Sequence, residues 1–148
     1  MIVNFALAAL MVGLTVTVHF FGLVTLMWVL HHHGHRFHAK DSWSGLGASI
    51  LVVVIGLMAI LTTEMWLYAV VYLAIGALDD LETALYFSIT SFTTLGFGDV
   101  VLDRKWRLLG AIEGANGLLL FGWSTAFLFD IIRRLRTLEQ EWLERADK

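Results

Sequence analysis

Three long apolar runs, separated by shorter polar stretches, dominate the chain of 148 residues. Residues 1–30 contain no Asp, Glu, Lys or Arg, residues 46–78 contain only Glu64, and residues 108–129 contain only Glu113. A helix needs about 20 apolar residues to cross a hydrocarbon layer of about 30 Å. Each run therefore predicts a transmembrane helix, and we expect an all-α, multi-pass membrane protein.

The first run does not have the form of a cleavable signal peptide. Such a peptide has a basic start and an apolar core of about 7–15 residues, whereas residues 1–30 begin without charge and stay apolar. Seven Lys and Arg residues lie in the link 31–45 and after residue 132, against three between the second and third runs. Short basic loops remain in the cytoplasm. We expect an outside N-terminus, a cytoplasmic link and a cytoplasmic C-terminus in a cell membrane protein.

Composition narrows the possible functions. The chain is 58% apolar and 16% charged, which is too apolar for a soluble domain of this size. It has no cysteine, which excludes disulfides and thiolate metal sites. Its net charge of −3 gives no general basic surface for nucleic acid. We do not expect an enzyme, because no nucleophile, base and orienting group stand at an interpretable spacing.

A short apolar segment lies between the second and third runs. Asp79, Asp80 and Glu82 form an N-cap pattern in which Asp79 accepts from the Glu82 amide, which predicts a helix over 80–92. A helix of this length is re-entrant, since it is too short to span. The segment 93–99 follows it, and its two alternating glycines permit unusual backbone conformations. Because irregular backbone at membrane depth must be surrounded by protein or water, we expect this segment to line a pore.

The segment Thr93-Thr94-Leu95-Gly96-Phe97-Gly98-Asp99 resembles the potassium-channel signature sequence. Residues 84–88, Ala-Leu-Tyr-Phe-Ser, are similar to the aromatic-rich pore helix of bacterial two-transmembrane potassium channels, and the resemblance runs from about Asp79 to Arg134. It implies a potassium-channel pore domain with an additional N-terminal helix. The expected parts are an outer helix 46–78, a pore helix 80–92, a selectivity filter 93–99 and an inner helix 106–136, within a pore domain 46–136.

The resemblance also implies how ions are bound. Rings of main-chain carbonyl oxygens replace the hydration shell of a dehydrated potassium ion. In an extended run, successive carbonyls advance by about 3.3 Å per residue and can hold a short queue of ions. One copy of the segment gives one edge of a cage, so four chains are expected to form a homotetramer. Potassium is assigned to the carbonyls of Thr94, Leu95, Gly96 and Phe97, with Gly98 allowing them to face the axis.

The expected function is therefore potassium-selective conduction, with membrane lipids and further copies of the chain as partners. No cofactor is expected beyond potassium ions in the filter. The residues expected to support the filter are Thr93, Asp99, Thr90, Tyr86 and Phe87.

Three positions depart from the commoner family pattern. Phe97 replaces a tyrosine whose hydroxyl can brace the filter, and Leu95 replaces valine or isoleucine. Thr90 stands where some bacterial relatives carry glutamate. These changes put filter rigidity in doubt, so we expect a filter prone to inactivation. A non-selective monovalent cation channel is the alternative.

The predicted inner helix contains several glycines. Gly110 and Gly114 form a small-xxx-small pair suited to close helix contact. Gly117 is either a gating hinge or a packing glycine, and the sequence leaves both open. Beyond the inner helix, the tail 137–148 is predicted to be a cytoplasmic amphipathic helix, either bundled with its copies or lying on the membrane.

Histidines are concentrated in the link 31–45. Their imidazoles either bind a metal or sense protons, or belong to a solvated loop. His19, Glu64 and Glu113 lie inside spanning segments, where ionisable groups are either functional or held by hydrogen bonds. A histidine-dependent redox or metal-transport protein is a less favoured third function. The candidate pH or metal-responsive residues are His31, His32, His33, His35 and His38.

Overall fold

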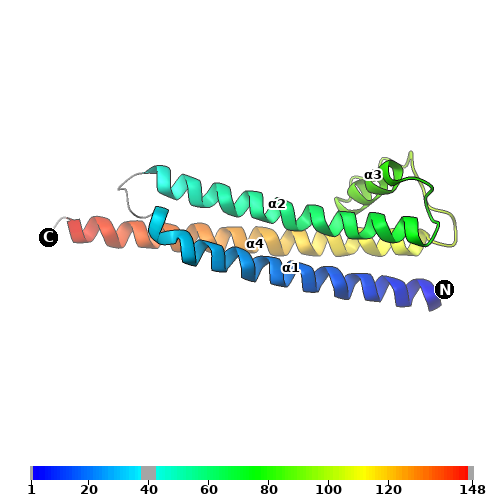
Figure 1. Cartoon of the computed structure of the whole chain (residues 1–148), viewed down its shortest axis with the longest axis horizontal. Helices are drawn as coiled ribbons and strands as arrows, with labels where there is room; N and C mark the ends of the chain where they lie inside the picture. The colour runs from blue at the N-terminus through cyan, green and yellow to red at the C-terminus, as the bar shows by residue number, and fades with distance from the viewer. Residues whose placement is uncertain (1, 38–42, 147–148) are drawn as a thin grey trace.

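The structure is a computed structural model in which four helices account for most of the chain (Figure 1). It describes the main chain of residues 2–37 and 43–146 and the side chains of residues 2–32 and 47–134. The described residues contain no strand. The helices are α1 (Ile2–Phe37), α2 (Trp43–Ala74), α3 (Leu81–Phe92) and α4 (Arg107–Ala146).

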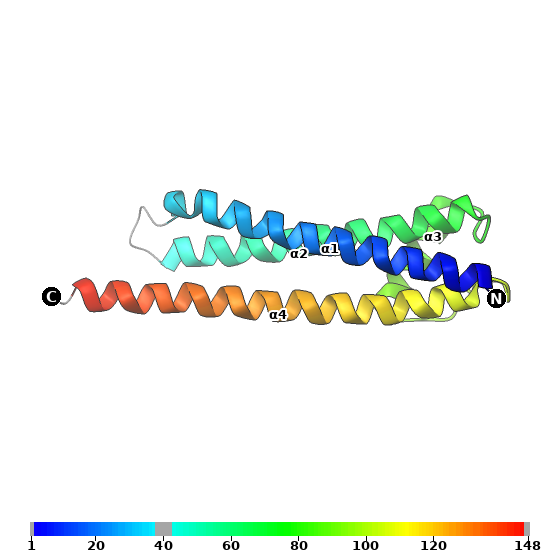
Figure 2. The ribbon, with the colours of Figure 1, turned by 90° about the horizontal axis from the view of Figure 1, so that it is seen from below.

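Three of these helices are long and apolar enough to cross a membrane, namely α1, α2 and α4. They lie side by side, with α2 antiparallel to the other two (Figures 1 and 2). The predicted all-α membrane fold is therefore confirmed. The N-terminus and α3 lie at one end of the bundle, and the C-terminus lies at the other. With 40 residues, α4 is about 60 Å long and reaches beyond its neighbours.

The long helices differ from the predicted bounds. Helix α1 continues through residues 31–37, so the first part of the predicted link is helical rather than a loop. Helix α2 ends at Ala74 because Gly76 takes a left-handed conformation with φ of +62°. The Gly76 amide donates to the Leu73 carbonyl at 3.0 Å, and the Ala77 amide donates to Tyr72 at 2.9 Å. These two bonds form a Schellman motif, which ends the helix before residue 78.

The start of α3 also differs from the prediction. Asp80, not Asp79, is the N-cap: its backbone is extended and its Oδ1 accepts from the Thr83 amide at 2.8 Å. The predicted pairing of Asp79 with Glu82 was wrong, because the helix begins one residue later. The hydrogen bond from Thr83 lowers the pKa of Asp80 below its usual value. Glu82 lies in the first turn, where a negative charge is favoured by the helix dipole.

Helix α1 packs on α2 through small residues. A Cβ added at Gly22 would lie 2.7 Å from the Ile60 side chain, and one at Gly56 would lie 2.6 Å from Leu26. Lipid tails are as apolar as leucine, so membrane helices associate through close packing and hydrogen bonds rather than hydrophobic burial. The two glycines therefore set how closely α1 approaches the rest of the protein.

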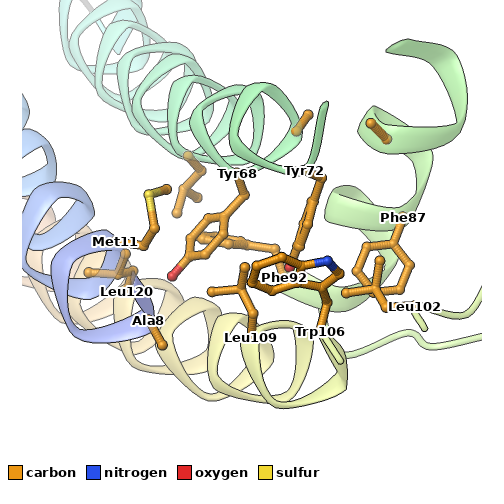
Figure 3. Packing of buried hydrophobic residues seen from close by; sticks show 13 residues of the cluster. Ala8, Met11, Tyr68, Tyr72, Phe87, Phe92, Leu102, Trp106, Leu109 and Leu120 are labelled. Atoms are coloured by element: carbon orange, nitrogen blue, oxygen red, sulfur yellow. The ribbon is translucent and has the colours of Figure 1, made fainter. Parts of the chain in front are cut away.

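An aromatic cluster holds α3 against α2 and α4 (Figure 3). The rings of Tyr72 and Phe87 meet edge to face with centroids 5.2 Å apart, and Phe92 is completely buried beside Tyr68. Edge-to-face pairs are favoured by the charge distribution of the rings. The cluster therefore fixes one side of α3 and leaves its other side exposed.

Three glycines of α4 bring its backbone close to α3. A Cβ at Gly110 would lie 3.0 Å from the Phe87 ring, and one at Gly114 would lie 3.1 Å from the Ser91 carbonyl oxygen. A Cβ at Gly117 would overlap the carbonyl group of Phe92, at 2.8 Å from its carbon. The close contact predicted for Gly110 and Gly114 is present, with α3 as its partner. At Gly117 the contact supports the packing interpretation, and α4 continues through it as an unbroken helix.

Candidate functional site

The loop 93–99, hereafter the candidate filter, is tied to the last turn of α3. The Thr93 amide donates to the Ile89 carbonyl at 3.0 Å, and the Thr94 amide donates to Ser91 at 2.9 Å. The Gly96 amide donates to the Thr90 carbonyl, also at 3.0 Å. The partial negative charge at the C-terminal end of α3 therefore lies next to the candidate filter and favours a cation there.

The backbone of the candidate filter alternates in hand. Thr94, Gly96 and Gly98 have φ of 59°, 51° and 78°, whereas no other non-glycine residue described has a positive φ. Such alternation turns amide groups to one side of the chain and carbonyl groups to the other. The segment is therefore not a regular strand, since a strand has negative φ throughout. The alternation nevertheless suits a line of carbonyl ligands better than a strand does, because strand carbonyls point alternately to both sides.

Thr94 is the strained member of this segment. A β-branched residue at positive φ is a genuine outlier, because its side chain crowds the backbone. Such conformations persist only where surrounding contacts impose them, and they cluster at functional sites. Here the contacts that hold Thr94 in this conformation are hydrogen bonds, which the main-chain amides of Thr94 and Gly96 donate to carbonyl groups of α3.

One side-chain hydrogen bond braces the far end of the candidate filter. The Tyr86 hydroxyl donates to Asp99 Oδ2 at 2.7 Å, and Asp99 Oδ1 accepts from the Val100 amide at 3.1 Å. The bond from Tyr86 lowers the pKa of Asp99, and the same bond raises the pKa of Tyr86. The predicted supporting residues Tyr86 and Asp99 are thus brought together by the fold.

The other predicted supporting residues have different surroundings. Thr90 is buried and its hydroxyl donates to the Phe87 carbonyl at 3.0 Å, so only its main-chain oxygen reaches the candidate filter. The Thr93 hydroxyl likewise donates within α3, to Ile89 at 2.7 Å. The Phe87 ring lies in the core, in contact with Tyr72 of α2 and close to Gly110 of α4 (Figure 3).

Apolar groups at the candidate filter and on α4 lack cover within one chain. Leu95 is 57% exposed and Phe97 is 67% exposed. On α4, the exposed side chains of Leu118, Leu119 and Trp123 line a shallow apolar depression. Acidic and basic side chains around the loop are exposed as well. They are Asp79, Asp80, Glu82, Asp99 and Asp103, against Arg104, Lys105 and Arg107.

A buried polar cluster lies behind α3, and the sequence did not reveal its partners. Glu113 of α4 is fully buried and accepts from the Tyr72 hydroxyl of α2 at 2.5 Å. Its other oxygen lies 2.6 Å from the Ser88 hydroxyl of α3. Ser88 was hidden in an apolar stretch, and only the helical spacing of Glu113 from Gly110, Gly114 and Gly117 could have placed the carboxyl toward α3.

A second polar cluster joins α1 to the other long helices. His19 Nδ1 lies 2.9 Å from Glu64 Oε1, and His19 Nε2 lies 3.4 Å from the Ser124 hydroxyl. One turn away, the Asn116 amide donates to the Thr15 hydroxyl at 2.7 Å. Both ring nitrogens of His19 therefore have protein partners, which leaves neither available for an iron or metal ion.

The histidines of the predicted link are only partly described. His31 and His32 are exposed on α1, and the His32 ring stacks on Trp28 with centroids 5.1 Å apart. The side chains of His33 and His35, and all of His38, lie outside the described residues. Within the part of the chain that the structure describes, no group of three or more His, Asp or Glu side chains is arranged to hold a metal.

Together, three membrane-capable helices, a short capped helix and an irregular loop at one end of the bundle define a membrane protein of the channel class. A family profile described as "Ion channel" matches residues 50–134, more than half of the chain. The chain therefore belongs to the two-transmembrane-type ion channel family. The match includes α3 and the candidate filter and leaves out α1. None of the curated proteins and none of the solved structures compared with the chain matches it.

Proposed function

We propose that the chain is one subunit of a homotetrameric, potassium-selective channel in which four candidate filters meet on one axis. The observation that carries the proposal is the alternating backbone of Thr94, Gly96 and Gly98, held against the C-terminal end of α3. Carbonyl oxygens of Thr94, Leu95, Gly96 and Phe97 would then replace the hydration shell of K⁺. The dipole of α3 adds attraction for a cation.

The exposed apolar groups support the assembly. Leu95 and Phe97 stand beside a polar main-chain segment, and the apolar depression on α4 is open. Contiguous exposed apolar surface on a channel subunit is expected to meet lipid or a second copy. In a cyclic tetramer, neighbouring subunits would cover these apolar groups, and the four sets of carbonyl groups would form closed rings.

The charges support an orientation in the cell membrane. The C-terminal parts of α1 and α4, which carry Arg36, Arg133 and Arg134, lie at the end opposite the candidate filter, and short basic segments remain in the cytoplasm (Figure 1). The candidate filter would then open toward the outside. There, an excess of acidic over basic side chains from four subunits would raise the local cation concentration.

A non-selective monovalent cation channel is the second candidate. It is favoured because few side-chain hydrogen bonds support the candidate filter. Phe97 has no hydroxyl group, and the Thr90 hydroxyl donates within α3. At the end of the loop farther from α3 along the chain, the hydrogen bond from Tyr86 to Asp99 is the one side-chain hydrogen bond from α3 among the described residues. A loosely held filter discriminates poorly between ions of different size.

Recording from the purified protein in planar bilayers with KCl on one side and NaCl on the other distinguishes the two functions. We expect a reversal potential close to the potassium equilibrium potential. Gly96→Ala should abolish the current, because alanine is strained at a φ of 51°, whereas Gly13→Ala on α1 should not, because no atom lies within 4 Å of the added Cβ. A reversal near zero would establish the non-selective channel, and the absence of any current would refute both.

A further inference from the structure

The carboxyl group of Glu113 contacts two other helices at the level of α3. Its Oε2 accepts from the Tyr72 hydroxyl of α2 at 2.5 Å, and its Oε1 lies 2.6 Å from Ser88 Oγ of α3. The same Ser88 Oγ lies 2.8 Å from the main-chain oxygen of Met65 in α2. Three helices therefore meet in one continuous line of polar atoms.

The number of protons in this line depends on the state of the carboxyl. A serine hydroxyl has a single proton, so Ser88 cannot donate to both Glu113 and Met65. An ionised Glu113 would leave one of these two contacts without a proton. A neutral Glu113 that carries its proton on Oε1 donates to Ser88, Ser88 donates to Met65, and Tyr72 donates to Oε2. All three contacts are then hydrogen bonds.

Among the described side chains, no positively charged group forms an ion pair with Glu113. The ion pairs among the described side chains are His19 with Glu64, and Asp130 with Arg133 and Arg134. None of them includes Glu113, whose exposed fraction is 0%. An ionised carboxylate buried without a cation is strongly unfavourable, so the neutral acid is the form that this site accommodates.

We propose that Glu113 is a neutral positioning residue that fixes α3, and through it the candidate filter, between α2 and α4. The connection is short, because Ser88 lies two residues before Thr90, whose carbonyl accepts from the Gly96 amide. This inference rests on the proposed function. It adds that the Glu113 carboxyl controls how long the filter stays in its conducting form.

Three substitutions separate hydrogen bonding from space filling. Glu113→Gln keeps an acceptor for Tyr72 and a donor for Ser88, so the decay of potassium current should stay as slow as in the wild type. Glu113→Leu fills the space without those bonds and should speed the decay by about tenfold, as expected for buried polar partners left unpaired. Ser88→Ala should act like Glu113→Leu, and combining the two should add little. Glu64→Gln is the matched control at the other buried carboxyl and should leave the decay unchanged.

Two readouts do not require conduction. Amide hydrogen exchange of residues 93–98 should stay slow in the wild type and in Glu113→Gln, and should become faster in Glu113→Leu and Ser88→Ala. The infrared band of a protonated carboxyl should be lost in Glu113→Gln and retained in Glu64→Gln. Equal protection in the Gln and Leu variants, or no protonated band assignable to Glu113, would overturn the proposal. If these two readouts behave as expected but no variant conducts, the proposed function has failed and the positioning role stands.

Discussion

Two carboxyl groups are buried in the spanning helices, and their partners are of different kinds. Glu64 faces an imidazole, His19 on α1, and its Oε2 has no hydrogen-bond partner among the described residues. Glu113 faces two hydroxyl groups and has both oxygens engaged. We infer from this difference that Glu64 fastens the additional helix α1, whereas Glu113 positions α3.

The α1 seam, defined as His19, Glu64 and Ser124, is a set of hydrogen bonds between helices in apolar surroundings. The α3 end, defined as Tyr72, Ser88 and Glu113, lies behind the candidate filter. We therefore expect substitutions in the α1 seam to change stability and to leave ion selectivity intact. Substitutions near the α3 end should change conduction.

Gly117→Ala should have the largest effect, because its Cβ would overlap the carbonyl group of Phe92 at the end of α3. Either α4 moves away or the candidate filter is displaced, and backbone overlap of this kind is among the changes that destabilise by several kcal/mol. We expect loss of both the assembled particle and the current, measured by size-exclusion chromatography and bilayer recording. Gly13→Ala on α1 is the control, since nothing lies within 4 Å of the Cβ that it adds. Normal conduction by Gly117→Ala would mean that α4 does not approach α3 this closely.

Glu64→Ala should loosen α1 without altering selectivity. It leaves the His19 Nδ1 group buried without a partner, at an expected loss of about 1–3 kcal/mol in the free energy of unfolding. Replacing both His19 and Glu64 by leucine removes the unpaired group and should recover most of that loss. Denaturation in detergent micelles measures both variants. A changed reversal potential in Glu64→Ala would contradict the division between the two regions.

Tyr86→Phe should shorten the lifetime of the conducting filter severalfold, because it removes the bond to Asp99. The lowered pKa of Asp99 adds a pH dependence with a defined sign. In the wild type the carboxylate should stay charged as the outside pH falls through the ordinary carboxyl value, and lose its charge only below it. Without Tyr86, the fall in conductance on acidification should move to higher pH. An unchanged acid midpoint in recordings of both proteins would show that the bond does not control Asp99.

Asp80→Ala should have a small effect confined to the start of α3. It removes the acceptor of the Thr83 amide, so hydrogen exchange of the first turn of α3 should become faster. Asp79→Ala is the matched control, because Asp79 is not the cap. If Asp79→Ala had the larger effect, the N-cap would have to move back to the residue that the sequence pattern favoured.

The fold could be predicted from the sequence because its signals are local. Long apolar runs with at most one acidic residue give spanning helices by length alone, and the apolar stretch between Asp80 and Thr93 is too short to span a membrane. The predicted ends of the helices were less accurate than the predicted helices themselves. Gly76 ends α2 by taking a positive φ, and the sequence does not distinguish this glycine from those inside α1 or α4.

The candidate site was predictable only in part, because hydrogen-bond partners come from tertiary packing. The motif gave the loop and named Tyr86 and Asp99 as supporting residues, but it did not predict the hydrogen bond between them. It could not show that the Thr90 hydroxyl turns back into α3, or that Ser88 meets a carboxyl from α4. Partners 25 residues apart or more become visible only when the helices are packed.

In the proposed channel, main-chain oxygens of four identical loops hold potassium ions on an axis. Electron cryo-microscopy of the purified protein in KCl tests it most directly. We expect a fourfold particle with a column of ion density between the carbonyl groups of residues 94–97. A monomeric or dimeric particle, or a fourfold particle without density on that axis, would contradict it.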